Sequence, residues 1–157
     1  MSPSMCGMMP VTLSDLMNNA YRVLGLTGAA AQADIDAAAR QLRLWDNPAD
    51  IVPTVNDAPW IGPIPRRRPD IEAAVARLTE PASRLRARLW WFAGPPPTDG
   101  APGGDDWRGA HDRLLIQLYH GLTREPRAED VPAWSGLIRH FAAFARSDEV
   151  LAALVDL

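Results

Sequence analysis

The hydrophobic positions along the chain recur three and four residues apart, and this spacing predicts α-helices with one apolar face each. Period, capping residues and breaks together predict seven helices, over residues 14–24, 32–45, 69–80, 81–92, 106–122 and 129–145 and from residue 147 onward. No alternating apolar and polar run is longer than a few residues, so no strand is predicted. The expected fold class is all-α.

Proline and glycine interrupt this pattern mainly in two places. Ten of the 15 prolines lie within residues 48–69 and 95–102, and eight of the 13 residues in 94–106 are glycine or proline. Proline lacks an N–H donor and glycine is costly to order, so neither stretch is expected to be a regular element. We therefore expect the following organisation: a flexible N-terminus (1–12), a helical unit (13–92) with a long Pro-rich loop (46–68), a linker (93–106), and a helical hairpin with a C-terminal helix (107–157).

Composition narrows the class of protein. The chain has 157 residues, 47% of them hydrophobic, and one cysteine, which is typical of a globular protein without an internal disulfide. No apolar run is long enough to span a membrane, and the first residues lack the pattern of a signal peptide, so we expect a cytoplasmic protein. All 16 basic residues are arginine. Enzymes that need a lysine as Schiff-base former or phosphate-loop cation are thereby excluded.

Charge is concentrated in the middle of the chain. Residues 59–98 carry seven arginines and three acids, whereas the segments before and after have net charges of −3 and −4. Three tryptophans lie in or beside this basic region, so arginine and aromatic side chains are expected to form a partner-binding surface. Its predicted members are Arg66, Arg67, Arg68, Asp70, Arg84, Arg88, Trp60, Trp90 and Trp91.

Two segments carry a resemblance to a known family. Residues 21–26 read Tyr-Arg-Val-Leu-Gly-Leu and precede a turn and the amphipathic helix predicted at 32–45, while residues 78–84 read Leu-Thr-Glu-Pro-Ala-Ser-Arg. In this order the segments resemble the start and the third-to-fourth helix junction of J-domains. The resemblance covers about half of the chain and implies a four-helix unit with an antiparallel hairpin.

J-domains stimulate Hsp70 ATPases through a His-Pro-Asp tripeptide between their second and third helices, and here that loop contains no histidine. Arg68-Pro69-Asp70 lies before the third predicted helix. It can be a modified Hsp70 contact, or an ordinary helix start with proline in the first turn and an acidic N-terminal residue. We favour the helix start.

The second half is similar to a group of bacterial J-like proteins with tetratricopeptide-like helices. The similar segments are residues 111–120, which read His-Asp-Arg-Leu-Leu-Ile-Gln-Leu-Tyr-His, and residues 134–141, which read Trp-Ser-Gly-Leu-Ile-Arg-His-Phe. This similarity implies a helical interaction scaffold in a bacterial multi-protein system, and no catalytic activity.

No constellation for catalysis or metal binding is visible. His111-Asp112 resembles the pair of metal-dependent phosphohydrolases, but no histidine precedes it. His111 and His120 lie nine positions apart and face opposite sides of a helix, so they cannot share a metal. Cys6 has no activating neighbour in sequence. We predict no catalytic residue, metal or cofactor.

Three aromatic residues in a row raise a packing question. If residues 90–92 continue a helix, they cover about 200° and cannot all face one core. Trp90 or Trp91 must then pack elsewhere, either on the C-terminal helices, which we favour, or on a partner. The function expected from the sequence is a non-catalytic protein–protein interaction adaptor or accessory subunit. The alternatives are a degenerate Hsp70 co-chaperone and a nucleic-acid-binding module that uses the basic region from Arg66 to Arg88.

Overall fold

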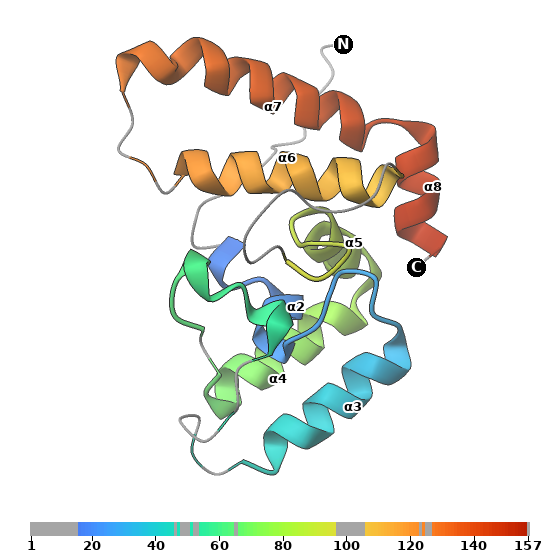
Figure 1. The fold of residues 1–157 in the computed structure, drawn as a ribbon. Helices are drawn as coiled ribbons and strands as arrows, with labels where there is room; N and C mark the ends of the chain where they lie inside the picture. The colour runs from blue at the N-terminus through green and yellow to red at the C-terminus, as the bar shows by residue number, and fades with distance from the viewer. Residues whose placement is uncertain are drawn as a thin grey trace, which may run out of the picture.

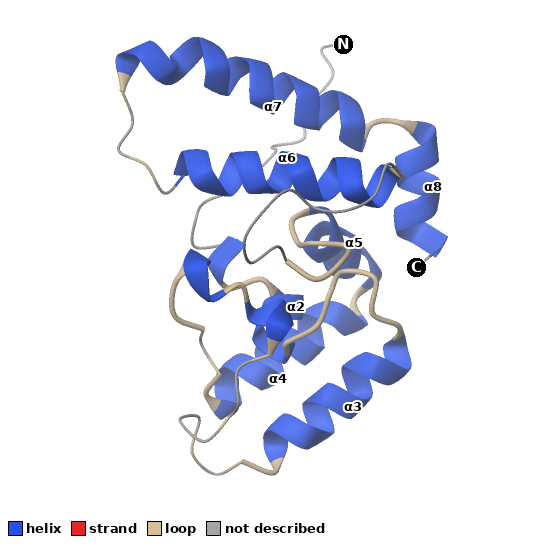
Figure 2. Ribbon diagram, viewed as in Figure 1, coloured by secondary structure: helices blue, strands red, loops and turns tan. Residues whose placement is uncertain are grey.

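The computed structural model of the chain describes residues 16–45, 47, 51, 54–64, 66–96, 106–122, 124 and 127–156. This part of the chain is all-α, as predicted, and no strand occurs in it (Figure 2). Its seven α-helices are α2 (Ala20–Leu24), α3 (Gln32–Arg43), α4 (Arg68–Thr79), α5 (Pro81–Leu89), α6 (Trp107–Leu122), α7 (Val131–Ala145) and α8 (Asp148–Asp156). Three short 3₁₀-helices are η2 (Val55–Asp57), η3 (Pro59–Ile61) and η4 (Ala128–Asp130). The first two lie in the segment predicted as one long loop.

The helix predicted over 14–24 is wrong in one respect, because the structure breaks it at Asn18 and Asn19. Leu16 and Met17 are helical, and a new helix, α2, begins at Ala20. The Asn19 side chain accepts a hydrogen bond from the Tyr21 N–H and so caps α2. Its amide nitrogen donates to the Ala87 carbonyl on α5, so the break is also tied to a distant helix.

The helix predicted over 81–92 is also shorter than expected, because α5 ends at Leu89. Trp91 and Phe92 leave the helix and are both fully buried. Two long-range hydrogen bonds fix this exit: the Trp91 indole donates to the Leu26 carbonyl over 2.8 Å, and the Gly28 N–H donates to the Phe92 carbonyl over 2.7 Å. Because the helix ends before them, the consecutive aromatic residues 90–92 are not constrained to the angular spacing of a helix.

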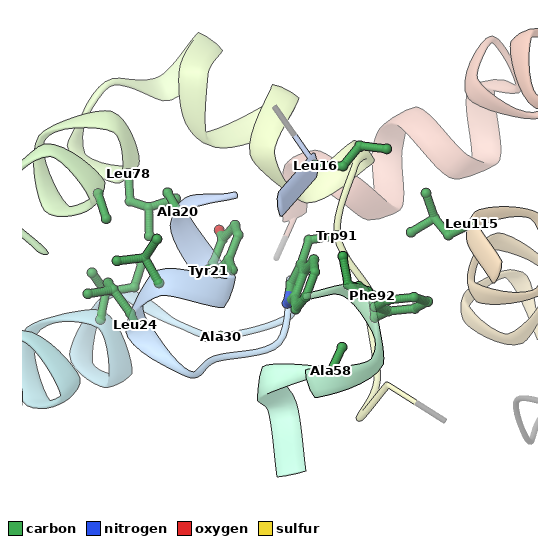
Figure 3. Packing of buried hydrophobic residues seen from close by; sticks show 14 of the residues in the cluster. Leu16, Ala20, Tyr21, Leu24, Ala30, Ala58, Leu78, Trp91, Phe92 and Leu115 are labelled. Carbon is green, nitrogen blue, oxygen red and sulfur yellow. The ribbon is translucent and has the colours of Figure 1, made fainter. Parts of the chain in front are cut away.

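The helices form two groups (Figure 1), and buried side chains from both make one core. Helices α2 to α5 form the N-terminal group, in which α4 packs on α2, α3 and α5. Helices α6 and α7 lie across this group as a hairpin, and α8 lies beside α5. One hydrophobic cluster joins residues from both groups; Tyr21, Trp91, Phe92 and Leu115 are among the members that Figure 3 labels.

Close packing between α6 and α7 depends on a glycine. A Cβ atom at Gly121 would lie only 2.2 Å from the nearest ring carbon of Trp134. The indole therefore occupies the space that any other residue at this position would need. Gly136 on α7 differs, because a Cβ atom there would meet nothing within 4 Å.

Candidate functional site

Arg66, the first residue of the predicted basic surface, is buried and not exposed. Its guanidinium forms a two-point ion pair with the Asp57 carboxylate, through Nη1 to Oδ2 over 2.9 Å and through Nη2 to Oδ1. Its Nε donates to the Val23 carbonyl over 2.8 Å. A buried charge needs such partners, since water cannot solvate it. Arg66 therefore ties η2 to α2 and contributes nothing to an exposed surface.

A second buried arginine, which the sequence analysis did not single out, completes this cluster. Arg22 on α2 is fully buried and donates to the backbone carbonyls of Met17, Asp57, Ala58, Gly62 and Pro63. Burial lowers the pKa of this guanidinium, and the charge of Asp57 opposes that effect. Arg22, Asp57 and Arg66 together hold residues 54–64 against α2, and we call them the buried charge cluster. The signal in the sequence was one charged residue inside an otherwise apolar short helix.

Arg67, Arg68 and Asp70 lie at the start of α4, where the sequence predicted a helix start. The Asp70 carboxylate accepts the Arg67 N–H over 3.0 Å and forms an ion pair with the Arg67 side chain. The hydrogen bond from the Arg67 side chain holds the pKa of Asp70 below its usual range. Arg67 and Arg68 are exposed. Asp70 thus acts as a helix cap in this structure, which confirms that part of the prediction.

The tryptophans mainly join the two helix groups. The Trp90 ring stacks on Phe141 of α7, with ring centroids 4.7 Å apart. Phe92 stacks on Tyr119 of α6 at 5.7 Å, and the Trp60 ring stacks on His120 at 5.6 Å. These contacts confirm the favoured interpretation that tryptophan attaches the C-terminal helices. We call this set the aromatic junction; because Trp91 is fully buried, it belongs to the core and to no exposed surface.

His111 and Asp112 lie beside the aromatic junction and bind the end of α5 and the residues that follow it. The His111 ring, which is fully buried, contacts the Asp112 carboxylate through Nδ1 at 3.0 Å and the Leu89 carbonyl through Nε2 at 2.9 Å. Asp112 also accepts the N–H groups of Ala93 and Gly94, so the pair fixes the exit of the chain from α5.

Arg84 and Arg88 are the two predicted residues that the structure brings together at a cavity. They lie four residues apart on α5, and both line a cavity between α5 and the end of α8. The cavity has a volume of about 490 Å³. Its other lining residues are Thr79, Pro81, Ala82, Leu85, Leu154 and Val155. Leu154 and Val155 could not be assigned to this cavity from the sequence, because their placement depends on how α8 folds back.

The outer face of α7 leaves large apolar side chains in solvent. Only Phe141 of this helix is buried, whereas Val131 and Ile138 are 58% and 56% exposed. These two residues lie seven positions apart, which is two helical turns, so they share one face. Arg139 and His140 lie beside them and are exposed, and α7 contains no acidic residue.

Other predictions concern chemistry that the described residues do not display. They contain no group of three histidine, cysteine or acidic side chains placed to hold a metal ion. None of their helices combines the length and the apolar character that crossing a bilayer requires. Cys6, the predicted flexible residues 1–12, part of the 46–68 loop and most of the 93–106 linker lie outside the described residues.

Comparison with known proteins identifies no relative: no family model, no curated protein and no solved structure matches the chain. The resemblance to J-domains therefore rests on the sequence motifs alone.

Proposed function

We propose that the chain is a non-catalytic protein-interaction adaptor that binds the amphipathic, acidic helix of a partner protein along the outer face of α7. The observation that carries this proposal is the exposure of Val131 and Ile138 on a helix that buries only Phe141. Apolar side chains of this size that recur at helical spacing are the usual anchors of helix-to-helix recognition.

The charge around this face supports an acidic partner. Arg139 lies on α7 itself and Arg146 directly follows the helix, and both are exposed. α7 itself has no acidic residue, and the nearest acids along the chain, Asp130 before the helix and Asp148 after Arg146, lie at its two ends. A partner helix with carboxylates beside its apolar face would therefore be drawn to this face and held in one orientation.

The proposed relation to J-domains rests on the sequence motifs, and the order of the N-terminal helices does not contradict it. Two longer helices, α3 and α4, pack on each other, the short helix α2 packs against α4, and α5 begins at Pro81. Asp70, which corresponds to the aspartate of the His-Pro-Asp tripeptide, accepts the Arg67 N–H and caps α4. This favours an interaction scaffold over an Hsp70 co-chaperone. The burial of Arg66 weighs against nucleic acid, because its guanidinium is paired with Asp57 and cannot reach a phosphate.

The adaptor proposal is tested with a photoreactive amino acid at position 138 and by affinity purification with an Ile138→Arg variant. Leu44→Arg is the matched control, because Leu44 is an exposed apolar residue (82%) directly after α3, outside the proposed face. We expect one partner protein to crosslink at position 138 and to be recovered with the wild type and the control. At least tenfold less should be recovered with Ile138→Arg.

Two results would contradict the adaptor proposal. One is equal recovery of the partner with Ile138→Arg, which would place the contact elsewhere. The other is crosslinking only to a second copy of the same chain, which would make α7 a self-association surface. Circular dichroism of each variant checks that the helices are retained.

A further inference from the structure

We propose that the cavity between α5 and α8 binds a small amphipathic carboxylate, that is, a molecule with an apolar body and one carboxylate group. Its volume of about 490 Å³ lies within the range of small-molecule sites, roughly 300–1,000 Å³. The cavity is separate from the outer face of α7, so this inference does not depend on the adaptor proposal.

The first reason is the electrostatic state of Arg88. This side chain is only 5% exposed, and its guanidinium donates to the Tyr21 hydroxyl and to the Leu154 carbonyl. Its third nitrogen, Nη2, is buried and has no hydrogen-bond partner. Among the described residues, no carboxylate lies within ion-pair distance of Arg88. A buried cation without a counter-charge is costly, and a bound anion would remove that cost.

The second reason is that Arg84, which lines the same cavity, also has a nitrogen without a hydrogen-bond partner. Its Nη1 donates to the Gln32 side chain and its Nη2 to the Ala30 carbonyl, while its buried Nε has no partner. These anchors hold the guanidinium in place. Two arginines four residues apart on α5 therefore line the same cavity, and each has one buried nitrogen without a hydrogen-bond partner. Their positive charge beside the cavity favours a carboxylate as the anionic group of a ligand.

The rest of the wall selects the body of the ligand. Leu85, Leu154 and Val155 supply aliphatic surface, and Pro81 and Ala82 close the end near the start of α5. The carboxylate nearest in sequence, Glu80, accepts from the N–H groups of Ala82 and Ser83 and so caps α5. It is engaged there and does not neutralise the arginines. A phosphate or sulfate ion alone would leave the aliphatic wall uncovered.

Isothermal titration calorimetry with octanoate tests the inference on the full chain at neutral pH. We expect one site per chain with a Kd below about 1 mM. Octanol, which keeps the aliphatic chain and lacks the charge, and inorganic phosphate, which keeps the charge and lacks the chain, should each bind at least tenfold more weakly. Either of two results would overturn the inference. One is octanol binding as tightly as octanoate, and the other is no heat with octanoate at about 10 mM, roughly ten times the expected Kd.

Two variants locate the site. Arg88→Gln should weaken octanoate at least tenfold, but it also removes a buried contact and can affect folding. Val155→Asp avoids this problem, because Val155 is 66% exposed at the rim of the cavity. Its added carboxylate should weaken octanoate roughly three- to tenfold by repulsion. Leu44→Asp, an exposed change outside the cavity, should stay within about twofold of the wild type. Equal affinity for octanoate in wild type and Val155→Asp would place binding elsewhere and overturn the assignment.

Discussion

Two junctions hold this protein together, and they use opposite chemistry. The buried charge cluster holds residues 54–64 against α2 through Arg22, Asp57 and Arg66, with nearly every donor matched to an acceptor. The aromatic junction fastens α6 and α7 to the N-terminal helices by ring stacking and burial. The first requires each partner to be present, because removing one strands a charge in the interior. The second loses stability in proportion to the contact area removed.

The largest loss of stability is expected from a substitution in the buried charge cluster. Asp57→Ala leaves two buried guanidinium groups without their carboxylate and removes the acceptor of the Thr54 N–H. We expect a loss of about 4 kcal/mol in the free energy of unfolding, measured by urea denaturation.

The control for this prediction removes both charges of the pair. The double variant Asp57→Leu with Arg66→Met should recover at least half of the loss, since no unpaired charge then remains at Arg66. A double variant no more stable than Asp57→Ala would show that the cluster does not behave as a coupled pair.

A smaller effect concerns the contact between α6 and α7. Gly121→Ala should destabilise the protein by about 2 kcal/mol, because the new methyl group would overlap the Trp134 ring. Gly136→Ala on α7 is the matched control, and it should stabilise by about 0.5–1 kcal/mol, since alanine favours the helix and meets no neighbour. Thermal unfolding of both variants measures the difference. The same sign for both would mean that helix propensity, and not Trp134, decides at residue 121.

The smallest effect concerns the stacking energy at the aromatic junction itself. In a double-mutant cycle of Trp90→Ala and Phe141→Ala, we expect a coupling of about 1 kcal/mol, which is typical of a stacked aromatic pair. Strictly additive losses would show that the two rings contribute by burial alone. The two junctions would then differ in coupling as well as in chemistry.

The helices were largely predictable because their signals are local. Periodic apolar positions and end residues placed α3, α4, α6, α7 and α8 within about two residues of the observed bounds. The break at Asn19 also had a local signal, since asparagine is a common helix cap, but apolar periodicity on both sides of it masked that signal. The end of α5 at Leu89 had none, because the hydrogen bonds of Trp91 and Phe92 are made to residues more than 60 positions earlier.

The candidate site was less predictable, because burial of arginine depends on tertiary partners. Arg66 and Arg67 are adjacent, yet one is buried against Asp57 and the other is exposed. Nothing in their sequence neighbourhood distinguishes them. Arg84 and Arg88 were recognisable as sharing a helix face, but the cavity beside them exists only because α8 returns to α5. The sequence predicted that tryptophan side chains attach the C-terminal helices, because side chains this large need a large covering surface. It did not predict which residues each tryptophan contacts.

The hydroxyl of Tyr119 has a consequence for the order in which the protein is made. It donates to the carbonyl of Leu16, which lies 103 residues earlier in the chain. A ribosome adds about 5–20 residues per second, so the partner of Leu16 is synthesised roughly 5–20 s after Leu16 itself. During that interval the N-terminal helices carry apolar surface that α6, α7 and α8 cover in the finished protein. Nascent chains paused before residue 107 are therefore the stage at which this protein is most exposed to aggregation and to chaperone binding.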